Sequence, residues 1–343
     1  MDKFITEICQ RVYKKCNVTK LKNKTILVTG ANGLIGGFLS DFFYFLNEKY
    51  SFNIRIILTS LSKKPERIKH LLLKDNVVYM PQDLSENYKE FNYDIDYCFY
   101  CAGYAQPSKF LSNTSKTFFL NTNGLYNTMN NVFKNKNARG IFLSSSEIYT
   151  MNETNSSHKE IDKISLSLEH GRNSYIFGKI AGEMIMNDFK NVGCDIVSAR
   201  VSLCYGPGHL YDDGRVMSDL TRKAFSNDSL IKLFDDGSAL RRYLHISDFL
   251  IILLNITLFG KKNVYNVGGK EEVSIYDMAL HIGKFFNKEI KKGISNNKIS
   301  TSAPKNVWVS LKRYEKEFGN INTLSFSDGI EKYLKWFVNK YKG

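Results

Sequence analysis

Disulfide bonds, prolines and long hydrophobic runs are scarce in this chain. Its 343 residues include only 6 cysteines and 5 prolines. So few cysteines exclude a small disulfide-stapled scaffold, and so few prolines exclude a collagen-like or proline-rich extended chain. The longest apolar stretch, Phe249 to Phe259, falls short of the roughly 20 residues that cross a bilayer as a helix. A buried helix is therefore expected there.

No signal peptide is expected at the N-terminus, because charges interrupt residues 1–10 where an apolar core would stand. We therefore expect a protein of the reducing cytoplasm with no membrane partner. The 48 Lys and Arg exceed the 34 Asp and Glu and give a net charge of +14. Most of these cations are lysines dispersed along the whole chain, which favours a solvated basic surface and no nucleic-acid partner.

Strands and helices alternate along most of the sequence. Because the expected strands are apolar throughout, they indicate a parallel sheet covered on both faces, which is the doubly wound α/β or Rossmann architecture. Strands are expected at 25–29, 54–58, 77–80, 97–101, 140–143, 195–201 and 264–267, and helices at 38–50, 65–73, 115–134, 174–190 and 248–259.

Three parts of the chain are expected. Residues 1–21 have apolar positions at helical spacing and form an N-terminal extension, which can pack on the body or on a second subunit. Residues 22–200 plus 240–267 make up the Rossmann domain. After residue 201 the strand–helix rhythm weakens, so residues 201–239 plus 268–343 are assigned to a smaller substrate-binding lobe.

A glycine cluster separates the first expected strand from its helix. Gly30, Gly33 and Gly36 allow a tight turn, a close approach of a pyrophosphate to the backbone, and close packing of the helix. A turn without a ligand can use the same glycines, but their position in the first strand–helix unit favours a bound dinucleotide. The second strand ends without the acid typical of NAD sites, and Lys63, Lys64 and Arg67 follow it. NAD is expected, and NADP stays open because these cations can either receive a 2′-phosphate or be ordinary solvated residues.

Tyr175 and Lys179 lie one turn apart in an expected helix and so share a face. A cation near a phenol favours phenolate, which can take a proton from a sugar hydroxyl. Ser145 follows an expected strand upstream, where its hydroxyl can hold the same substrate oxygen. The spacing alone is also typical of a surface pair, but the three residues together point to catalysis.

With these features the chain resembles the extended short-chain dehydrogenase/reductases, specifically the NAD-dependent epimerase/dehydratase group that acts on nucleotide sugars. The resemblance runs from about Lys24 to the C-terminus. It is carried by TGANGLIG (29–36), QDLSE (82–86), YCAG (100–103), NTNG (121–124), SSSEIY (144–149), YIFGK (175–179), YGPG (205–208), RRYLHISD (241–248) and YNVGG (265–269).

The resemblance implies specific roles for residues of the chain. It implies a catalytic set of Ser145, Tyr175 and Lys179, with Glu147 donating a proton or orienting the ring. It implies a nucleotide-diphosphate sugar as substrate and a homodimer formed through the helices at 115–134 and 174–190. The implied cofactor contacts are Gly30, Asn32, Gly33, Leu34, Ile35, Gly36, Thr59, Ser60, Asp83, Leu84, Cys101, Ala102, Gly103, Asn121, Tyr175, Lys179 and Arg200, and the implied substrate contacts are Gln106, Ser146, Arg215 and Arg241.

One departure from the family pattern and one likeness to a branch of the family narrow the expected reaction. Family 4,6-dehydratases carry an Asp-Glu pair where this chain has Ser146-Glu147, so dehydration is disfavoured. The run Asp213-Gly214-Arg215-Val216 is similar to the UDP-glucuronate decarboxylase branch. We expect oxidation of the sugar C4 hydroxyl followed by decarboxylation, with 4-epimerisation or 4-keto reduction as alternatives. A non-enzymatic dinucleotide-binding regulator is the alternative of another class.

No metal site is expected. Cys98 and Cys101 lie an odd number of residues apart in a strand and so point to opposite faces. The histidines show no ligand spacing.

Overall fold

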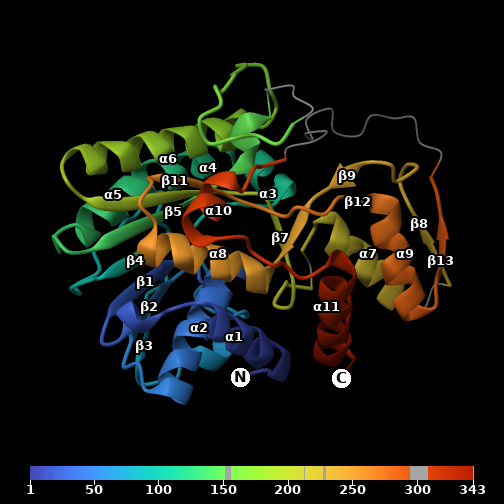
Figure 1. The fold of residues 1–343 in the computed structure, drawn as a ribbon, viewed down its shortest axis with the longest axis horizontal. Coiled ribbons are helices and arrows are strands. Elements are labelled where there is room, and N and C mark those ends of the chain that lie inside the picture. The colour runs from blue at the N-terminus through green and yellow to red at the C-terminus, as the bar shows by residue number, and fades with distance from the viewer. Residues whose placement is uncertain (151–155, 212, 227–228, 294–307, 343) are drawn as a thin grey trace.

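The protein is described by a computed structural model that covers residues 1–150, 156–211, 213–226, 229–293 and 308–342. Across this part of the chain, a seven-stranded sheet lies between two layers of helices (Figure 1). The strand order is β3-β2-β1-β4-β5-β6-β11, and every neighbouring pair is parallel. The expected doubly wound α/β fold is confirmed.

The strands of the central sheet are short and almost fully buried, as the apolar runs predict. Within the described ranges, three additional two-stranded sheets lie outside it. The central strands are β1 (Thr25–Thr29), β2 (Arg55–Thr59), β3 (Val77–Tyr79), β4 (Tyr97–Tyr100), β5 (Arg139–Ser145), β6 (Asp195–Val201) and β11 (Val264–Val267), and the others are β7 (Leu203–Tyr205) with β10 (Tyr243–His245), β8 (Leu230–Lys232) with β13 (Glu289–Lys291), and β9 (Leu240–Arg241) with β12 (Val273–Ser274).

Helices cover both faces of the sheet. Figure 1 shows α4, α5 and α6 on one face and α1, α2 and α8 on the other, while α7, α9 and α11 gather in a lobe beside the sheet. The α-helices are α1 (Lys3–Lys15), α2 (Leu34–Tyr50), α3 (Pro107–Ser112), α4 (Thr114–Asn121), α5 (Asn123–Val132), α6 (Asn173–Asn191), α7 (Val216–Phe225), α8 (Ile246–Phe259), α9 (Ile275–Phe286), α10 (Lys312–Phe318) and α11 (Phe326–Tyr341), and the 3-10 turns are η1 (Thr19–Leu21), η2 (Lys69–Leu71) and η3 (Ser146–Tyr149).

Alternate side chains of each strand enter different cores. In β1, Ile26 and Val28 join the core beneath α2 and α8, whereas Leu27 joins the core beneath α5. The lobe has an apolar cluster of its own, built from α7, α9 and α11. Helix α10 instead packs against α8 and β11. Part of the range assigned to the lobe, 268–343, thus contacts the Rossmann domain. The boundaries of the lobe remain a prediction.

The N-terminal helix α1 packs on the body of the chain. Its residues Ile5, Ile8 and Val12 are buried in the core that also contains α2 and α8. Its N-cap is Asp2, whose carboxylate accepts the Phe4 N–H at 2.8 Å. The sequence left open whether this extension packs on the body of the chain or on a second subunit. In the structure it packs on the body of the same chain.

Two expected helices differ in the structure. The segment at 65–73 contains only the 3-10 turn η2, because Arg67 and Ile68 turn inward and are buried. The expected helix at 115–134 is interrupted at Thr122, which separates α4 from α5. Gly124 then packs so closely that a Cβ there would lie 2.7 Å from the Leu84 carbonyl oxygen and 2.8 Å from the hydroxyl of Tyr100 in β4. The break lowers α5 onto the strands.

Candidate active site

The candidate site lies at the point where the winding of the sheet changes direction. Strand β1 lies next to β4, with β2 and β3 on one side and β5, β6 and β11 on the other. Ligands of doubly wound sheets bind beyond the carboxyl ends of the strands at such a point. Gly30 follows β1, Cys101 follows β4 and Ser145 ends β5. The sheet therefore brings three separate sequence motifs to one edge.

The glycine turn has the shape that a pyrophosphate needs. Gly30 has a φ of 64°, and a Cβ there would lie 2.6 Å from the Cys101 carbonyl oxygen. A Cβ on Gly36 would collide with the carbonyl of Gly30. Gly33 caps α2 without a side-chain hydrogen bond, so the first N–H groups of this helix, on Leu34 and Ile35, face an open end. The turn fits a bound dinucleotide.

The end of β2 holds small polar residues. Thr59 donates its hydroxyl to the Met80 carbonyl at 2.6 Å, and the Ser60 hydroxyl lies 2.6 Å from the Tyr79 hydroxyl. Neither residue carries the negative charge that often holds the ribose of NAD. Lys63 and Lys64 follow in exposed positions. These two lysines stay candidates for a 2′-phosphate contact.

Arg67 is not available for that role, which corrects the hypothesis drawn from the sequence. Its guanidinium is buried and donates to the Asp41 carboxylate at 2.6 Å. The Arg67 N–H donates to the Asn32 side chain of the glycine turn at 2.9 Å. A Cβ on Gly208 would lie 2.9 Å from the Arg67 Nε. Arg67 therefore ties the glycine turn and α2 to the YGPG loop.

Asp83 and Leu84 lie between β3 and β4, and Asn121 ends α4. Asp83 accepts the N–H of Ser85 at 3.0 Å and lies 3.4 Å from Lys116 Nζ. Burial alone would raise the pKa of Asp83, but these hydrogen bonds and the Lys116 charge lower it, so the carboxylate is ionised. The Asn121 Oδ1 is buried without a hydrogen-bond partner in the described part of the chain. Such an acceptor can be satisfied by water or by a ligand.

The turn after β4 lies directly beside Lys179. The Ala102 N–H donates to the Thr29 hydroxyl at 3.0 Å, which joins this turn to β1. A Cβ on Gly103 would lie 3.6 Å from the Lys179 Nζ. Lys179 itself donates to the Leu143 carbonyl at 2.7 Å. Burial lowers the pKa of Lys179 to about 7, although the nearby Cys101 and Glu183 oppose this shift.

Tyr175 is buried and hydrogen-bonded to Ser145. Burial raises the pKa of Tyr175 above its usual range, and the Glu147 charge adds to the increase. The hydrogen bond with Ser145 and the charges of Arg172 and Arg215 lower it. The sequence analysis predicted that Lys179 would be the cation that lowers the pKa of Tyr175. Its Nζ lies 5.8 Å from the Tyr175 ring centroid, and its own low pKa weakens its charge near neutral pH.

Glu147 is held by a residue that the sequence analysis did not select. Arg172 donates its Nε and Nη2 to the two carboxylate oxygens at 2.7 and 2.6 Å. The Arg172 guanidinium also lies 4.8 Å from the Phe110 ring centroid, and that ring stacks on Tyr175. Arg172 precedes Tyr175 by three residues, a helical spacing that is a usable sequence signal. Phe110 carries no comparable signal.

Arg215 lies on the lobe side of the site. It pairs with Asp213, whose carboxylate accepts the Arg215 Nε at 3.0 Å, and its Nη2 lies 3.4 Å from His209 Nε2. Burial and the Arg215 charge lower the pKa of His209, so the imidazole is neutral. Because Arg215 also acts on the pKa of Tyr175, the lobe brings a cation to the phenol.

The other predicted residues lie in different surroundings. Ser146 is buried at the start of η3, and Gln106 is half-buried at the start of α3. Arg241 lies in β9 and donates to the Leu240 carbonyl at 2.7 Å. Arg200 is buried and pairs with Glu183 at 2.7 Å, so its guanidinium is committed to a protein partner. Its predicted contact with the cofactor stays a prediction.

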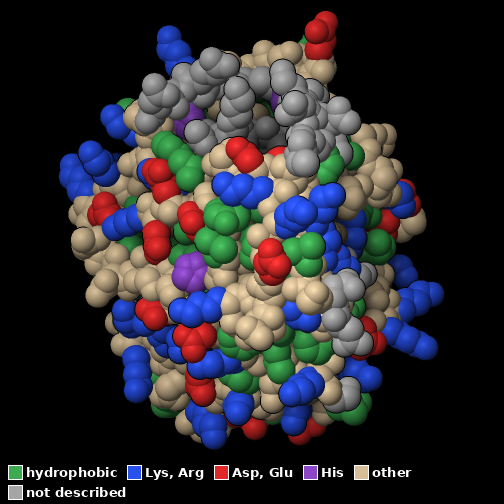
Figure 2. All heavy atoms as spheres, turned by 90° about the vertical axis from the view of Figure 1, so that its right-hand side faces the viewer, with side chains coloured by type: hydrophobic (Ala, Val, Ile, Leu, Met, Phe, Trp, Pro, Cys, Tyr) green, Lys and Arg blue, Asp and Glu red, His purple; other side chains and the backbone are tan. Residues whose placement is uncertain are grey.

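The described residues contain no group of three or more metal-ligating side chains. Cys98 and Cys101 pack into the cores on opposite faces of the sheet, as their spacing predicts. No helix in the described ranges is long and apolar enough to span a bilayer. In the view of Figure 2, basic side chains are interspersed with acidic ones and form no continuous stripe.

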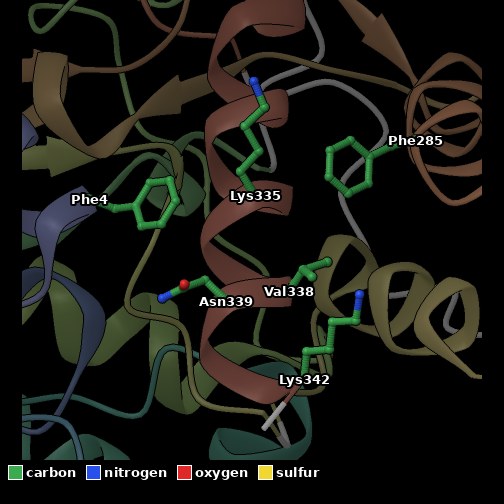
Figure 3. Close-up of a pocket in the computed structure, with 6 residues that line it drawn as sticks. All are labelled: Phe4, Phe285, Lys335, Val338, Asn339 and Lys342. Carbon is green, nitrogen blue, oxygen red and sulfur yellow. The ribbon is translucent and has the colours of Figure 1, made fainter.

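One surface groove lies away from these residues, between α1, α9 and α11. Figure 3 shows the ring of Phe4 directed toward α11 from one side, with Phe285 on the other side. The groove has a volume of about 610 Å³ and is open to solvent. It is lined by Phe4, Phe285, Lys335, Val338, Asn339 and Lys342.

A comparison with protein families decides the membership of the chain. The model of the NAD dependent epimerase/dehydratase family matches residues 26–268. This chain belongs to the NAD dependent epimerase/dehydratase family. The matched range begins in β1 and extends past β11, so it includes the whole central sheet. The predicted family, its enzymatic character and its dependence on NAD are confirmed.

Curated relatives of this epimerase/dehydratase chain have different reactions. The dTDP-4-dehydro-6-deoxy-D-allose reductase of Streptomyces bikiniensis is 26% identical over 75% of this chain and 79% of the relative. The UDP-glucuronic acid decarboxylase 1 of Danio rerio is 24% identical over 75% of this chain and 59% of the relative. The family membership therefore fixes the type of cofactor and leaves the individual reaction open.

Solved structures of the family have the same fold. An epimerase from Methanothermobacter thermautotrophicus is 19% identical and aligns with a TM-score of 0.77 over 98% of this chain and 96% of its own. A UDP-glucuronic acid 4-epimerase from Bacillus cereus, solved with UDP-glucuronic acid and NAD, is 23% identical with a TM-score of 0.72 over 92% of this chain and 100% of its own. At these identities the likeness establishes the fold.

Proposed function

We propose that this chain oxidises the C4 hydroxyl of a nucleotide-diphosphate sugar and then decarboxylates it, as a UDP-glucuronate decarboxylase does. The observation that carries the proposal is the arrangement at the switch point of the sheet. Tyr175 is hydrogen-bonded to Ser145, and Lys179 lies beside the turn after β4. The glycine turn after β1 fits the pyrophosphate of NAD.

NAD bound at the turn supplies the acceptor for the hydride that leaves C4. The Tyr175 oxygen takes the proton of the C4 hydroxyl, and the Ser145 hydroxyl holds the same substrate oxygen. Lys179 would hold the nicotinamide ribose, and the charges of Arg172 and Arg215 favour the phenolate of Tyr175. Arg215 and Arg241 bind the anionic part of the substrate.

Decarboxylation then needs no acid at C6. A 4-keto sugar with a carboxylate on C5 is a β-keto acid, so the bond from C5 to the carboxyl carbon breaks and its electron pair moves toward the ketone. Carbon dioxide leaves and C5 takes a proton, and the reduced cofactor, if bound at the glycine turn, would supply the hydride that restores the C4 hydroxyl. Arg172 donates a hydrogen bond to each carboxylate oxygen of Glu147, which argues against Glu147 as the acid for a leaving 6-hydroxyl and hence against dehydration.

A second candidate is reduction of a 4-keto sugar. It is favoured by the reductase relatives, 79% of whose length this chain covers. The same Tyr175 would then donate its proton to the ketone oxygen while C4 receives a hydride. Lys63 and Lys64, exposed after β2, would suit the 2′-phosphate of NADPH in that reaction.

One experiment separates these reactions. The purified protein is denatured to identify the dinucleotide it releases, and the native protein is then offered UDP-, GDP-, CDP- and dTDP-sugars under NMR. Loss of carbon dioxide from UDP-glucuronate is the expected result. An inverted C4 signal would establish a 4-epimerase instead, and consumption of reduced dinucleotide with a 4-keto sugar would establish a reductase.

A further inference from the structure

Arg172 joins three elements that meet at the candidate site. It stands at the start of α6, and its side chain is 6% exposed. Its two-pronged contact with Glu147 reaches η3, at distances of 2.7 and 2.6 Å. Such a bidentate pair fixes the plane of the carboxylate as well as its charge. The Arg172 N–H donates to the His170 Nδ1 at 3.3 Å, which fixes the start of the helix.

A stack of planar groups leads from Arg172 to the phenol. The Arg172 guanidinium lies 4.8 Å from the centroid of the Phe110 ring. The ring of Phe110 lies 4.7 Å from the ring of Tyr175, with an angle of 13° between their planes. Phe110 is 1% exposed and belongs to α3. The guanidinium, the phenyl ring and the phenol ring therefore come from separate stretches of chain and limit one another's rotation.

Charge at Tyr175 depends on the same residue. The groups that face the phenol are Glu147 from η3, Arg172 from the start of α6, Arg215 from the start of α7 and Ser145 from β5, with Lys179 on its own helix. His170 faces Arg172 and Glu147. The Glu147 charge opposes formation of phenolate, and Arg172 compensates that charge at close range.

We propose that Arg172 is a positioning residue of the site: its guanidinium fixes and neutralises the Glu147 carboxylate and, through the ring of Phe110, orients the phenol of Tyr175. The consequence for catalysis rests on the proposed function, in which Tyr175 takes the C4 proton. Without Arg172, Glu147 would act on the phenol uncompensated, and the phenolate would form only at higher pH.

The test measures the phenol directly and needs no substrate. A fluorinated tyrosine, whose phenol is more acidic, is placed at position 175 in the full chain with NAD present, and its ionisation is followed by fluorine NMR. In Arg172→Gln the titration should move up by about one pH unit, since an uncompensated charge at close range shifts a pKa by roughly one to three units. In Glu147→Gln/Arg172→Gln it should fall back to the wild-type pH or below it, because the Glu147 charge that raises the pKa of Tyr175 is then removed as well.

Three further variants separate charge from shape. Arg172→Lys keeps the charge and should titrate close to wild type. Phe110→Leu removes the stack, so its titration pH should hold while the fluorine signal broadens. Arg139→Gln is the matched control, because Arg139 pairs with Asp195 at 3.1 Å at the opposite end of β5. It should leave both the titration and the signal unchanged.

An unchanged titration in Arg172→Gln, or a double variant that titrates as high as Arg172→Gln, would overturn the proposal. If Arg172→Gln does not fold, Glu147→Gln alone decides: a lower titration pH supports the proposal, and an unchanged one overturns it. The proposed function fails separately, when wild-type protein converts no nucleotide sugar although the fluorophenol responds as expected. Where turnover is present, the acid limb of kcat should move with the titration.

Discussion

Tyr175 is the residue on which the proposed chemistry depends most directly. Tyr175→Phe removes the proton acceptor and keeps the ring that stacks on Phe110. Turnover should fall by roughly 100-fold to 10,000-fold, the usual contribution of a positioned general base. Binding of NAD, measured by titration calorimetry, should stay within about twofold because the glycine turn is untouched.

Tyr126→Phe is the matched control, because Tyr126 is 51% exposed on α5. It should retain wild-type turnover. Full turnover in Tyr175→Phe would contradict the enzymatic account of this site. A biological activity that survives in the same variant would favour the non-enzymatic regulator.

Lys179 links the site to the pH dependence of stability. Burial lowers the pKa of Lys179 to about 7 from an ordinary 10.5. The unfolded chain therefore holds this proton more tightly, so the cost of burying the ammonium is full below about pH 7 and disappears as the pH rises toward about 10.5. Wild type should gain thermal stability relative to Lys179→Met between about pH 6 and about pH 9.

The measurement is the difference in Tm between the two proteins across that pH range. The variant also loses the hydrogen bond from Lys179 to the Leu143 carbonyl. That loss is the same at every pH and so does not change the slope. A difference in Tm that is constant with pH would show that folding does not lower the pKa of Lys179.

At the scale of single elements, the turn between β1 and α2 is the most constrained segment of the site. Gly30→Ala has to accommodate a φ of 64° and a Cβ 2.6 Å from the Cys101 carbonyl oxygen. We expect a loss of about 2 kcal/mol in the free energy of unfolding. NAD affinity should fall at least about tenfold, because the turn moves away from the pyrophosphate.

Gly193→Ala provides the comparison for strain alone. Gly193 has a φ of 90°, and a Cβ there would meet no described atom within 4 Å. This variant should lose about 1 kcal/mol of stability and bind NAD like wild type. Equal NAD affinity in both glycine variants would show that the turn at Gly30 does not hold the cofactor. Chemical denaturation and calorimetry give the two quantities.

At the scale of the whole molecule, the layer of α4, α5 and α6 carries exposed apolar side chains. Phe119, Tyr126 and Met184 are 44%, 51% and 63% exposed, one on each helix. These helices cover one face of the sheet (Figure 1). A second copy of the chain is the partner that the family resemblance implies for this layer, and burial of such side chains would stabilise the pair.

Sedimentation analysis tests the expected homodimer. Wild type should sediment with twice the mass of the chain, and Met184→Glu should shift the equilibrium toward monomer by at least about tenfold, since a buried unpaired carboxylate is strongly unfavourable. Leu73→Glu is the control, because Leu73 is 94% exposed outside these helices. A wild-type monomer would refute the predicted assembly.

Much of the fold was predictable because its signals are local. The apolar runs that became β1 and β6, and the periodic stretch that became α6, each depend on residues near one another in sequence. The break at Thr122 was not predictable, since it follows from the contact of Gly124 with the carbonyl of Leu84 across the fold. The run NTNG at 121–124 has low helix propensity, but propensity alone does not fix the residue at which a helix breaks.

The sequence by itself determined the doubly wound sheet, the glycine turn and the family, because each depends on short motifs with fixed spacing. Only the tertiary structure decided which charged side chains are free to act. Arg67 was taken into a buried pair with Asp41, and Arg172 was brought to Glu147. Charge pairing depends on distances between residues far apart in the chain and on burial, and one-dimensional spacing carries neither.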